Sequence, residues 1–456
     1  METICAISTA QGKGAIAMIR ISGEESFDIC SKIFEAFSKK SIHTFKANSA
    51  IFGYIKDQNT IIDEVIVNKF IKSRSFTGED TIEISCHGSI YIQRRILQLI
   101  INQGIRLARP GEFTQRAFLN GKLDLTQAEA VADLIASESE AAHKIALLQL
   151  RGGVSNDLKV LREKLLNFAS LIELELDFSE EDVEFANRDQ LKNLLADVHK
   201  KISDLAQSFK LGNAIKNGIP VAIIGEPNVG KSTLLNTLLN EEKAIVSEIP
   251  GTTRDSIEDV ITIQGVLFRF IDTAGIRNST DIIENLGIER TFQKIEKAEI
   301  ILYLFDIASK NSWSKDVNIL IEKYPDKKWI FVANKIDKLP EKDLPKVEEF
   351  RGVKVVTISA KQQLHIQNII DALFEYVYQD NINPNQTIIT NSRHFEALTR
   401  ASEAIVRVRA GLQNALSGEI LSQDIREAIY HIGSITGEIS NNEVLGNIFG
   451  KFCIGK

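Results

Sequence analysis

Residues 220–239 read PVAIIGEPNVGKSTLLNTLL, and this stretch decides the fold of the central part of the chain. The run 220–224 is apolar and rich in β-branched residues, which predicts a buried strand. Residues 231–239 have the apolar spacing of an amphipathic helix. Between them stands G-x-x-x-x-G-K-S at 225–232, the pattern of a phosphate-binding loop in its expected strand–loop–helix context. Its glycines let backbone N–H groups approach phosphate oxygens, and the helix N-terminus favours an anion.

Further motifs predict contacts to a nucleoside triphosphate and its Mg²⁺. Lys231 is expected to bridge the β- and γ-phosphates, and the Ser232 hydroxyl to ligate Mg²⁺. Residues 260–263 and 266–271 read as an antiparallel hairpin that ends at Asp272-Thr273-Ala274-Gly275. The segment 251–255 lies before this hairpin, and we expect a threonine in it, Thr253, to close over Mg²⁺ when the γ-phosphate is present.

The next strand ends in a motif that reads the base. Residues 328–333 form an apolar run that leads into Asn334-Lys335-Ile336-Asp337. The Asp337 carboxylate can accept hydrogen bonds from N1 and N2 of guanine, whereas adenine has no such donor pair. Residues 355–361 supply the last strand and a loop for guanine O6. Four short motifs in the correct order on the correct elements together predict a GTP-binding domain.

The expected nucleotide-binding set combines all of these motifs. It comprises Asn228, Val229, Gly230, Lys231, Ser232, Thr233, Ser247, Ile249, Thr252, Thr253, Asp272, Thr273, Ala274, Gly275, Asn334, Lys335, Asp337, Ser359 and Ala360.

The flanking sequence predicts a multidomain chain. Residues 1–118 mix β-branched strands with a helix at 90–101, which indicates an α+β domain. Residues 119–217 and 379–456 are helical, and residues 218–378 alternate strands and helices as an α/β domain does. The economical interpretation is one all-α helical domain split in sequence by the inserted GTPase domain. Two separate helical domains are the alternative.

Composition places the chain among soluble globular proteins. It has 456 residues, with 44% hydrophobic and 25% charged, which are ordinary values for that class. Its cysteines, Cys5, Cys30, Cys86 and Cys453, lack metal-site spacing, so a reducing, cytoplasmic location is expected. No targeting peptide or membrane span is visible. The net charge of −7 argues against broad nonspecific binding to nucleic acid.

Motifs outside the GTPase segment narrow the family. They are SFTGED at 75–80, CHG at 86–88, RPGEFT at 109–114, NGKLDL at 120–125 and FCIGK at 452–456. Together with the P-loop they resemble the tRNA-modification GTPase family MnmE (TrmE), over nearly the whole chain. The resemblance implies an N-terminal folate-binding domain through which members form homodimers. It also implies a flavoprotein partner, MnmG (GidA), in a heterotetramer that modifies C5 of the wobble uridine, U34, of certain tRNAs with a carboxymethylaminomethyl-type group.

The resemblance also implies how GTP is hydrolysed. Ile276 stands where many small GTPases carry a water-orienting glutamine. The family instead uses a potassium ion beside the phosphates, and its ligands correspond here to Asn228, Ser247, Ile249 and Thr252. The family's water-orienting glutamate corresponds to Glu284, so the catalytic set is Glu284, Lys231 and Asn228. The alternatives are a solvated carboxylate for Glu284 and a turn-stabilising side chain for Asn228.

A second site follows from the same family. The positions that bind 5-formyltetrahydrofolate correspond to Arg20, Glu83, Lys122 and Lys456. The cations suit the carboxylates of the folate tail, and Glu83 can accept hydrogen bonds from the pterin edge. The alternative is that all four are ordinary surface charges. Cys453 is either structural or close to the modification chemistry, and its tail is a poor lipidation signal.

A ribosome-assembly GTPase, acting as an RNA-binding switch, is the competing function. Its P-loop motifs are similar, but the flanks show no aromatic or G-x-x-G signature for RNA, and the charge is acidic. A scaffold with a purely structural nucleotide is disfavoured by the intact phosphate and Mg²⁺ residues.

Overall fold

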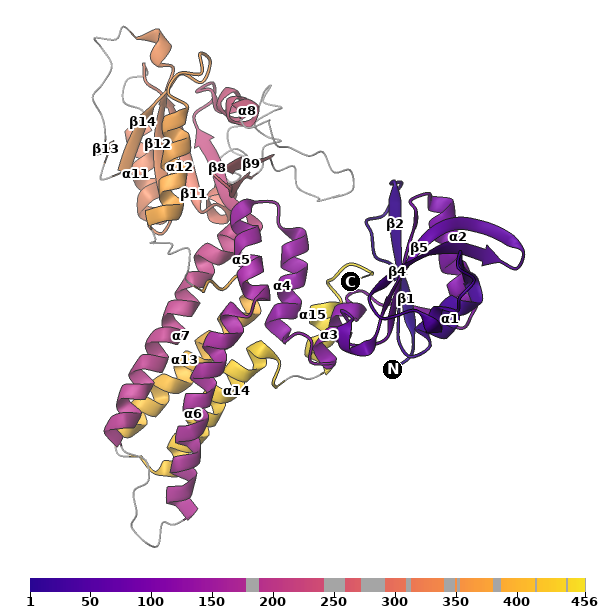
Figure 1. Ribbon diagram of the computed structural model, residues 1–456. Helices are drawn as coiled ribbons and strands as arrows, with labels where there is room; N and C mark the ends of the chain where they lie inside the picture. The colour runs from indigo at the N-terminus through magenta and orange to yellow at the C-terminus, as the bar shows by residue number, and fades with distance from the viewer. Residues whose placement is uncertain are drawn as a thin grey trace. The chain divides into compact units, whose positions relative to one another are not determined.

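The computed structural model describes residues 1–177, 188–241, 259–271, 292–308, 313–339, 349–350, 353–379, 387–414, 416–439 and 442–455 (Figure 1). The chain divides into two compact units. The first comprises Met1–Ala136, Ala146–Asp204 and Arg393–Lys456, and the second comprises Ser137–Ile145 and Leu205–Ser392. Three helices contain residues of both units: α5 (Glu140–Leu150), α7 (Arg188–Asn217) and α13 (Ser392–Gln413), of which Ser392 alone belongs to the second unit.

The N-terminal part of the first unit is a mixed sheet with strand order β3-β4-β5-β6-β2-β1-β7. Its strands are β1 (Ile4–Ile7), β2 (Ile16–Ser22), β3 (Phe34–Ala36), β4 (Ser49–Asp57), β5 (Thr60–Phe70), β6 (Thr81–His87) and β7 (Arg106–Leu107). The helices α1 (Ser26–Ile33) and α2 (Ile90–Ile101) pack on the sheet, and their apolar residues share a core with Ile19 and Ile84. Because side chains alternate along a strand, the neighbours Arg20 and Glu83 point to the opposite face.

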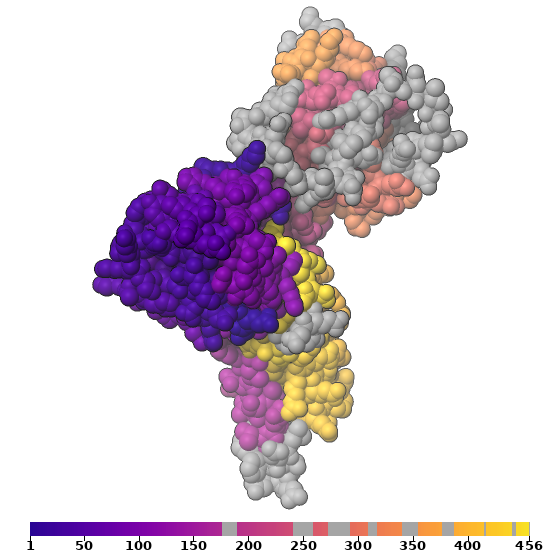
Figure 2. Space-filling view, turned by 90° about the vertical axis from the view of Figure 1, so that its right-hand side faces the viewer, coloured from indigo at the N-terminus to yellow at the C-terminus, as the bar shows by residue number. Residues whose placement is uncertain are grey.

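The rest of the first unit is helical. It contains α3 (Glu112–Leu119), α4 (Leu125–Ala136), α6 (Gly153–Asp177), α13 (Ser392–Gln413), α14 (Gly418–Thr436) and α15 (Asn442–Phe449), with the parts of α5 and α7 that belong to it. The helices α6 and α14 lie side by side although the GTPase segment separates them in sequence; they are magenta and yellow in Figure 1 and Figure 2.

Buried charges join the two sequence halves of this helical region. Glu129 on α4 accepts hydrogen bonds from Arg393 Nε and Nη2 at 3.0 and 2.9 Å, and its Oε2 lies 2.6 Å from His394 Nε2. Burial by itself would raise the pKa of Glu129, but His394 and Arg393 lower it to about 2. A buried carboxylate is tolerated only when it is paired in this way. The split all-α domain expected from the sequence is therefore confirmed.

The second unit is an α/β domain whose sheet has the order β13-β14-β12-β11-β8-β10-β9. The strands are β8 (Ile219–Gly225), β9 (Asp259–Ile263), β10 (Val266–Phe270), β11 (Ile300–Asp306), β12 (Lys328–Asn334), β13 (Glu349–Phe350) and β14 (Val353–Thr357). The central strands are parallel, and β9 and β13 pair antiparallel at the two edges. The hairpin expected at 260–271 is confirmed as β9 and β10.

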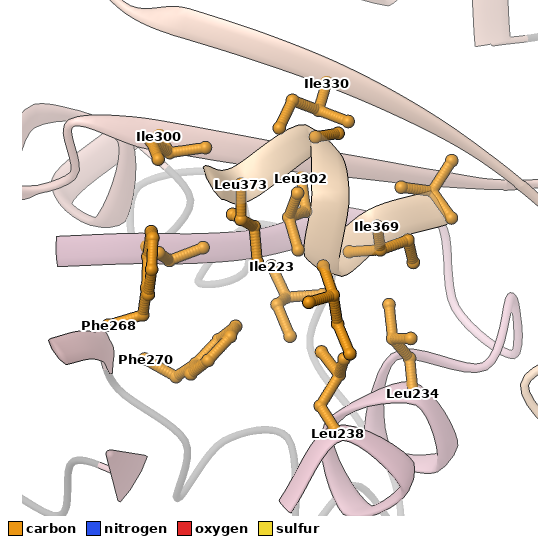
Figure 3. Close-up of a cluster of buried hydrophobic side chains, with 14 of the residues drawn as sticks. Ile223, Leu234, Leu238, Phe268, Phe270, Ile300, Leu302, Ile330, Ile369 and Leu373 are labelled. Atoms are coloured by element: carbon orange, nitrogen blue, oxygen red, sulfur yellow. The ribbon is translucent and has the colours of Figure 1, made fainter. Parts of the chain in front are cut away.

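The core of this domain holds the P-loop strand and helix in place. Its helices include α8 (Lys231–Glu241), α11 (Trp313–Lys323) and α12 (Gln367–Gln379). Ile223 of β8 packs with Leu234 and Leu238 of α8 and with Ile369 and Leu373 of α12 (Figure 3). A second core on the opposite face of the sheet gathers residues such as Ile224, Phe331 and Val317 of α11. With both faces covered, the parallel strands read as continuous apolar runs.

The N-terminal part of α5 belongs to the α/β unit. Residues 137–145 belong to it, and the Ala141 amide at the start of α5 donates to the Gly265 carbonyl at the tip of the β9–β10 hairpin, at 3.1 Å. Among the described residues, no helix combines the length and the apolar character that crossing a membrane requires.

Candidate functional site

The P-loop connects the interior strand β8 to α8, and its glycines are required by close contacts. Gly225 has φ +145°, and a Cβ there would lie 2.1 Å from the Leu304 carbonyl oxygen of the neighbouring strand. Gly230 has φ +102°, and a Cβ there would lie 2.4 Å from Asn334 Nδ2. Both positions need a residue without a side chain. The loop therefore places its backbone against the N-terminus of α8, where anions are favoured.

Lys231 bends back over this loop. Its ammonium donates to the carbonyl oxygens of Gly225 and Glu226 at 2.8 and 2.7 Å. Burial lowers its pKa below the ordinary lysine value, and the nearby charge of Lys294 lowers it further. An anionic ligand would stabilise this partly buried cation, so the position fits the expected phosphate contact. Ser232 and Thr233 follow in the first turn of α8.

A buried carboxamide connects the P-loop with the base-reading loops. Asn334, which is 2% exposed at the end of β12, donates from Nδ2 to the Val229 carbonyl oxygen at 2.7 Å. Its Oδ1 accepts from the backbone amides of Lys335 and Ala360 at 2.8 and 3.0 Å. Three segments that are far apart in sequence are thus joined by one side chain.

Lys335 and Asp337 complete the base-reading loop. Lys335 has φ +71°, and its ammonium donates to the Asn228 carbonyl oxygen at 2.6 Å. Asp337 Oδ1 accepts from the buried Ser359 hydroxyl at 2.5 Å. This bond orients the carboxylate that is expected to read guanine.

Sequence reasoning missed one residue that contacts these loops. Thr237 of α8 donates from its hydroxyl to the Ala360 carbonyl oxygen at 3.1 Å.

The structure therefore brings together part of the expected nucleotide site. Asn228, Val229, Lys231, Asn334, Lys335, Asp337, Ser359 and Ala360 make the hydrogen bonds above, and Gly230, Ser232 and Thr233 are adjacent to them in the chain. The remaining expected residues lie outside the described residues. They are Ser247, Ile249, Thr252 and Thr253, then Asp272, Thr273, Ala274 and Gly275, and the catalytic candidate Glu284. Only Ser232 of the Mg²⁺ pair and Asn228 of the K⁺ set are thus described.

The second expected site lies on the N-terminal sheet. Arg20 and Glu83 are directly opposite each other on β2 and β6, and Arg20 Nη2 lies 2.7 Å from Glu83 Oε1. The Arg20 guanidinium is 5.5 Å from the ring centre of Phe76 and 5.4 Å from that of Phe113. Sequence reasoning singled out the motifs that contain these rings, at 75–80 and 109–114, but not the rings themselves.

Lys122 contacts the loop that precedes β6, which also holds the Phe76 ring near Arg20. The Lys122 ammonium donates to the Ser73 carbonyl oxygen at 2.8 Å, and the Lys122 side chain lines an open cavity of about 530 Å³. The other lining residues are Ile71, Lys72, Ser73, Gly78, Asp80 and Asn120. The exposed Cys453 is fixed by its carbonyl oxygen, which accepts from the Gly111 amide at 3.3 Å. Lys456 lies outside the described residues.

These residues fit the group that the family would bind. A partly buried Arg–Glu pair, with its guanidinium over two aromatic rings, offers both a cation and a carboxylate to a ligand. Lys122, which lines the cavity, adds a second cation. Arg20 and Glu83 do not line this cavity. The pair suits an amide-bearing ring, and Lys122 suits a carboxylate.

The α/β fold and the bonded P-loop and Asn334–Asp337 loops define a guanine-nucleotide-binding protein of the P-loop class. Residues 125–453 match the family described as MnmE helical domain, and residues 3–122 match the one described as GTP-binding protein TrmE N-terminus. The chain belongs to the MnmE (TrmE) family of tRNA modification GTPases.

Curated relatives match the sequence of this chain over its full length. The chain is 51% identical to the tRNA modification GTPase MnmE of Flavobacterium psychrophilum, across 100% of this chain and 99% of that one. It is 54% identical to the protein of the same name from Parabacteroides distasonis, across 100% of both chains. Among solved structures, the G domain of the T. maritima FeoB iron transporter is 25% identical and covers 35% of this chain and 98% of its own, with a TM-score of 0.24.

Asp337→Asn is expected to change the preferred nucleotide from GTP to xanthosine triphosphate. The carboxylate accepts hydrogen bonds from guanine, whereas a carboxamide can donate to the oxygen at position 2 of xanthine. Fluorescence titration with both nucleotides measures the switch. Asp371→Asn, an exposed carboxylate on α12 that accepts from Gln367, is the matched control. Equal affinity of the parent protein for ATP and GTP contradicts the assignment.

Proposed function

We propose that this GTPase works with the flavoprotein MnmG (GidA) to install a carboxymethylaminomethyl-type group on C5 of U34 in certain tRNAs. The chain is 51% and 54% identical to two curated tRNA modification GTPases over its full length, which supports tRNA as the class of substrate. The observation that carries GTP recognition is the Asn334 carboxamide, which bonds the P-loop to the loops that hold Asp337 and Ala360. A guanine base and its phosphates would then be bound by one rigid set of loops.

The residues of this chain have distinct parts in the proposed hydrolysis. Lys231 neutralises phosphate charge, and Ser232 with Thr253 holds Mg²⁺, which supplies electrostatic stabilisation when bound. Asn228, Ser247, Ile249 and Thr252 hold a potassium ion in the place of an arginine finger. Glu284 orients the attacking water. Asn228 has φ +61°, and its carbonyl oxygen accepts from the Lys335 ammonium at 2.6 Å.

The N-terminal domain is proposed to bind the one-carbon donor. In a homodimer, Arg20, Glu83, Lys122 and Lys456 would hold 5-formyltetrahydrofolate, with Cys453 either packed nearby or close to the reacting carbon. The domain boundaries in this proposal are 1–118, 119–217, 218–378 and 379–456.

Analysis of wobble nucleosides tests the function. A deletion strain should lose the U34 modification, and Lys231→Ala should fail to restore it because phosphate binding is lost. Lys354→Ala, an exposed lysine paired with Glu375 on the same domain, should restore it fully. Mass spectrometry of digested tRNA gives the readout. Intact U34 modification in the deletion strain, together with defective ribosome assembly, would favour the ribosome-assembly alternative.

GTP turnover is expected to be faster in potassium than in sodium at matched ionic strength. Asn228→Ala should flatten this response because it removes a cation ligand, while Asn217→Ala, an exposed amide at the end of α7, should not. Phosphate release measures both. A response that persists unchanged in Asn228→Ala removes that side chain from the ion site.

Calorimetry is expected to show 5-formyltetrahydrofolate binding to the full-length protein without nucleotide. Glu83→Ala should weaken binding about tenfold or more, because a charge-assisted hydrogen bond to the ligand is lost. GTP affinity should stay unchanged. Glu64→Ala, an exposed carboxylate on β5, is the control. No measurable folate affinity in the parent protein means that the assignment of the site is wrong.

A further inference from the structure

Asp306 ends β11 beside the base-reading loop, and none of the sequence motifs includes it. It lies opposite Asn334 in the parallel pairing of β11 with β12. Its Oδ2 accepts from Lys335 Nζ at 2.8 Å and from Lys338 Nζ at 3.3 Å. We propose that Asp306 is a positioning residue for guanine nucleotide, acting through Lys335, and this proposal rests on the proposed GTP binding.

The Lys335 ammonium is held between two acceptors from different parts of the domain. One is the Asp306 carboxylate, and the other is the Asn228 carbonyl oxygen of the P-loop, at 2.6 Å. Lys335 and Asp306 side chains are 24% and 18% exposed, so water screens the pair only in part. A flexible four-carbon side chain is thereby kept in one position.

This position matters for the nucleotide because both bonded segments adopt a left-handed backbone. Asn228 has φ +61° and Lys335 has φ +71°. Non-glycine residues need surrounding contacts to stay in that region. Asp306 keeps the Lys335 ammonium aimed at the Asn228 carbonyl, so it stabilises the P-loop and the base-reading loop together. Without the carboxylate, the lysine is free to leave Asn228 for water, and the bound nucleotide loses part of its preorganised site.

A purely local role for Asp306 is distinguishable. Its Oδ1 accepts from the Ala308 amide at 3.0 Å, which stabilises the turn after β11. Asparagine retains this acceptor but loses the negative charge. Asp306→Asn therefore weakens the bond to Lys335 and leaves the hydrogen bond of the turn in place. The hydrogen bonds from Lys335, Ala308 and Lys338 lower the pKa of Asp306 despite its partial burial, so the carboxylate is charged at neutral pH.

Release of a fluorescent GDP analogue from the full-length protein is the test. Asp306→Asn is expected to speed release about tenfold, the factor that corresponds to a partly screened charge-assisted hydrogen bond. Asp371→Asn, on the same domain, is expected to leave the rate unchanged. In a Lys335→Met background, Asp306→Asn should change the rate less than about twofold, because the two residues act as one unit. In a Lys338→Met background, the full effect should remain.

Three results with a parent protein that binds GDP overturn the proposal. An unchanged release rate in Asp306→Asn, or an equal acceleration with and without Lys335, excludes positioning through that lysine. A lower unfolding midpoint of the nucleotide-free protein with unchanged release assigns Asp306 to the turn alone. For variants that release GDP too fast to follow, equilibrium competition between GDP and its analogue gives the same comparison. Failure of the parent protein to bind GDP at all refutes the proposed function instead, so the two failures are distinct.

Discussion

The nucleotide site depends on the hydrogen bonds that the buried carboxamide of Asn334 makes. Its donor and acceptor atoms are matched to the Val229 carbonyl and to two backbone amides, one of them from Ala360. A buried amide that lost a partner would cost about 1–3 kcal/mol, so the three segments are held in one arrangement. The same contact explains Gly230, because any side chain there would meet Asn334 Nδ2. Sequence motifs that look independent are thus parts of one hydrogen-bonded unit.

A charged network has the corresponding place in the N-terminal domain. Arg116, with its side chain 3% exposed, lies 3.0 Å from Glu112 and 2.8 Å from Glu79. Burial alone would raise the pKa of Glu112, but bonds from Arg106, the Arg109 amide and Arg116 lower it to about 2. The network connects the motifs at 75–80 and 109–114, whose phenylalanine rings face Arg20. These two motifs therefore place an aromatic ring each beside the Arg20 guanidinium.

The insertion of the GTPase domain is made possible by contacts between distant segments. Glu129, which precedes the insertion, pairs with Arg393, which follows it. Glu173 and Arg426 form a more exposed pair between α6 and α14, at 2.7 Å. The ends of the inserted domain return to the same helical unit, as domain insertion requires. The nucleotide-binding loops and the Arg20–Glu83 pair consequently lie in different compact units of one chain.

The sequence by itself determined the local elements and the class of site. The run 220–239 could be read as strand, loop and helix because apolar periodicity, glycine and a helix N-terminus act over a few residues. The helix at 90–101 and the base-reading loop at 334–337 were found for the same reason. Only the tertiary structure decided that Arg20 faces Glu83 and that Asp306 meets Lys335. Those pairs depend on strand order and register, which arise from packing between segments far apart in the chain and leave no local pattern to read.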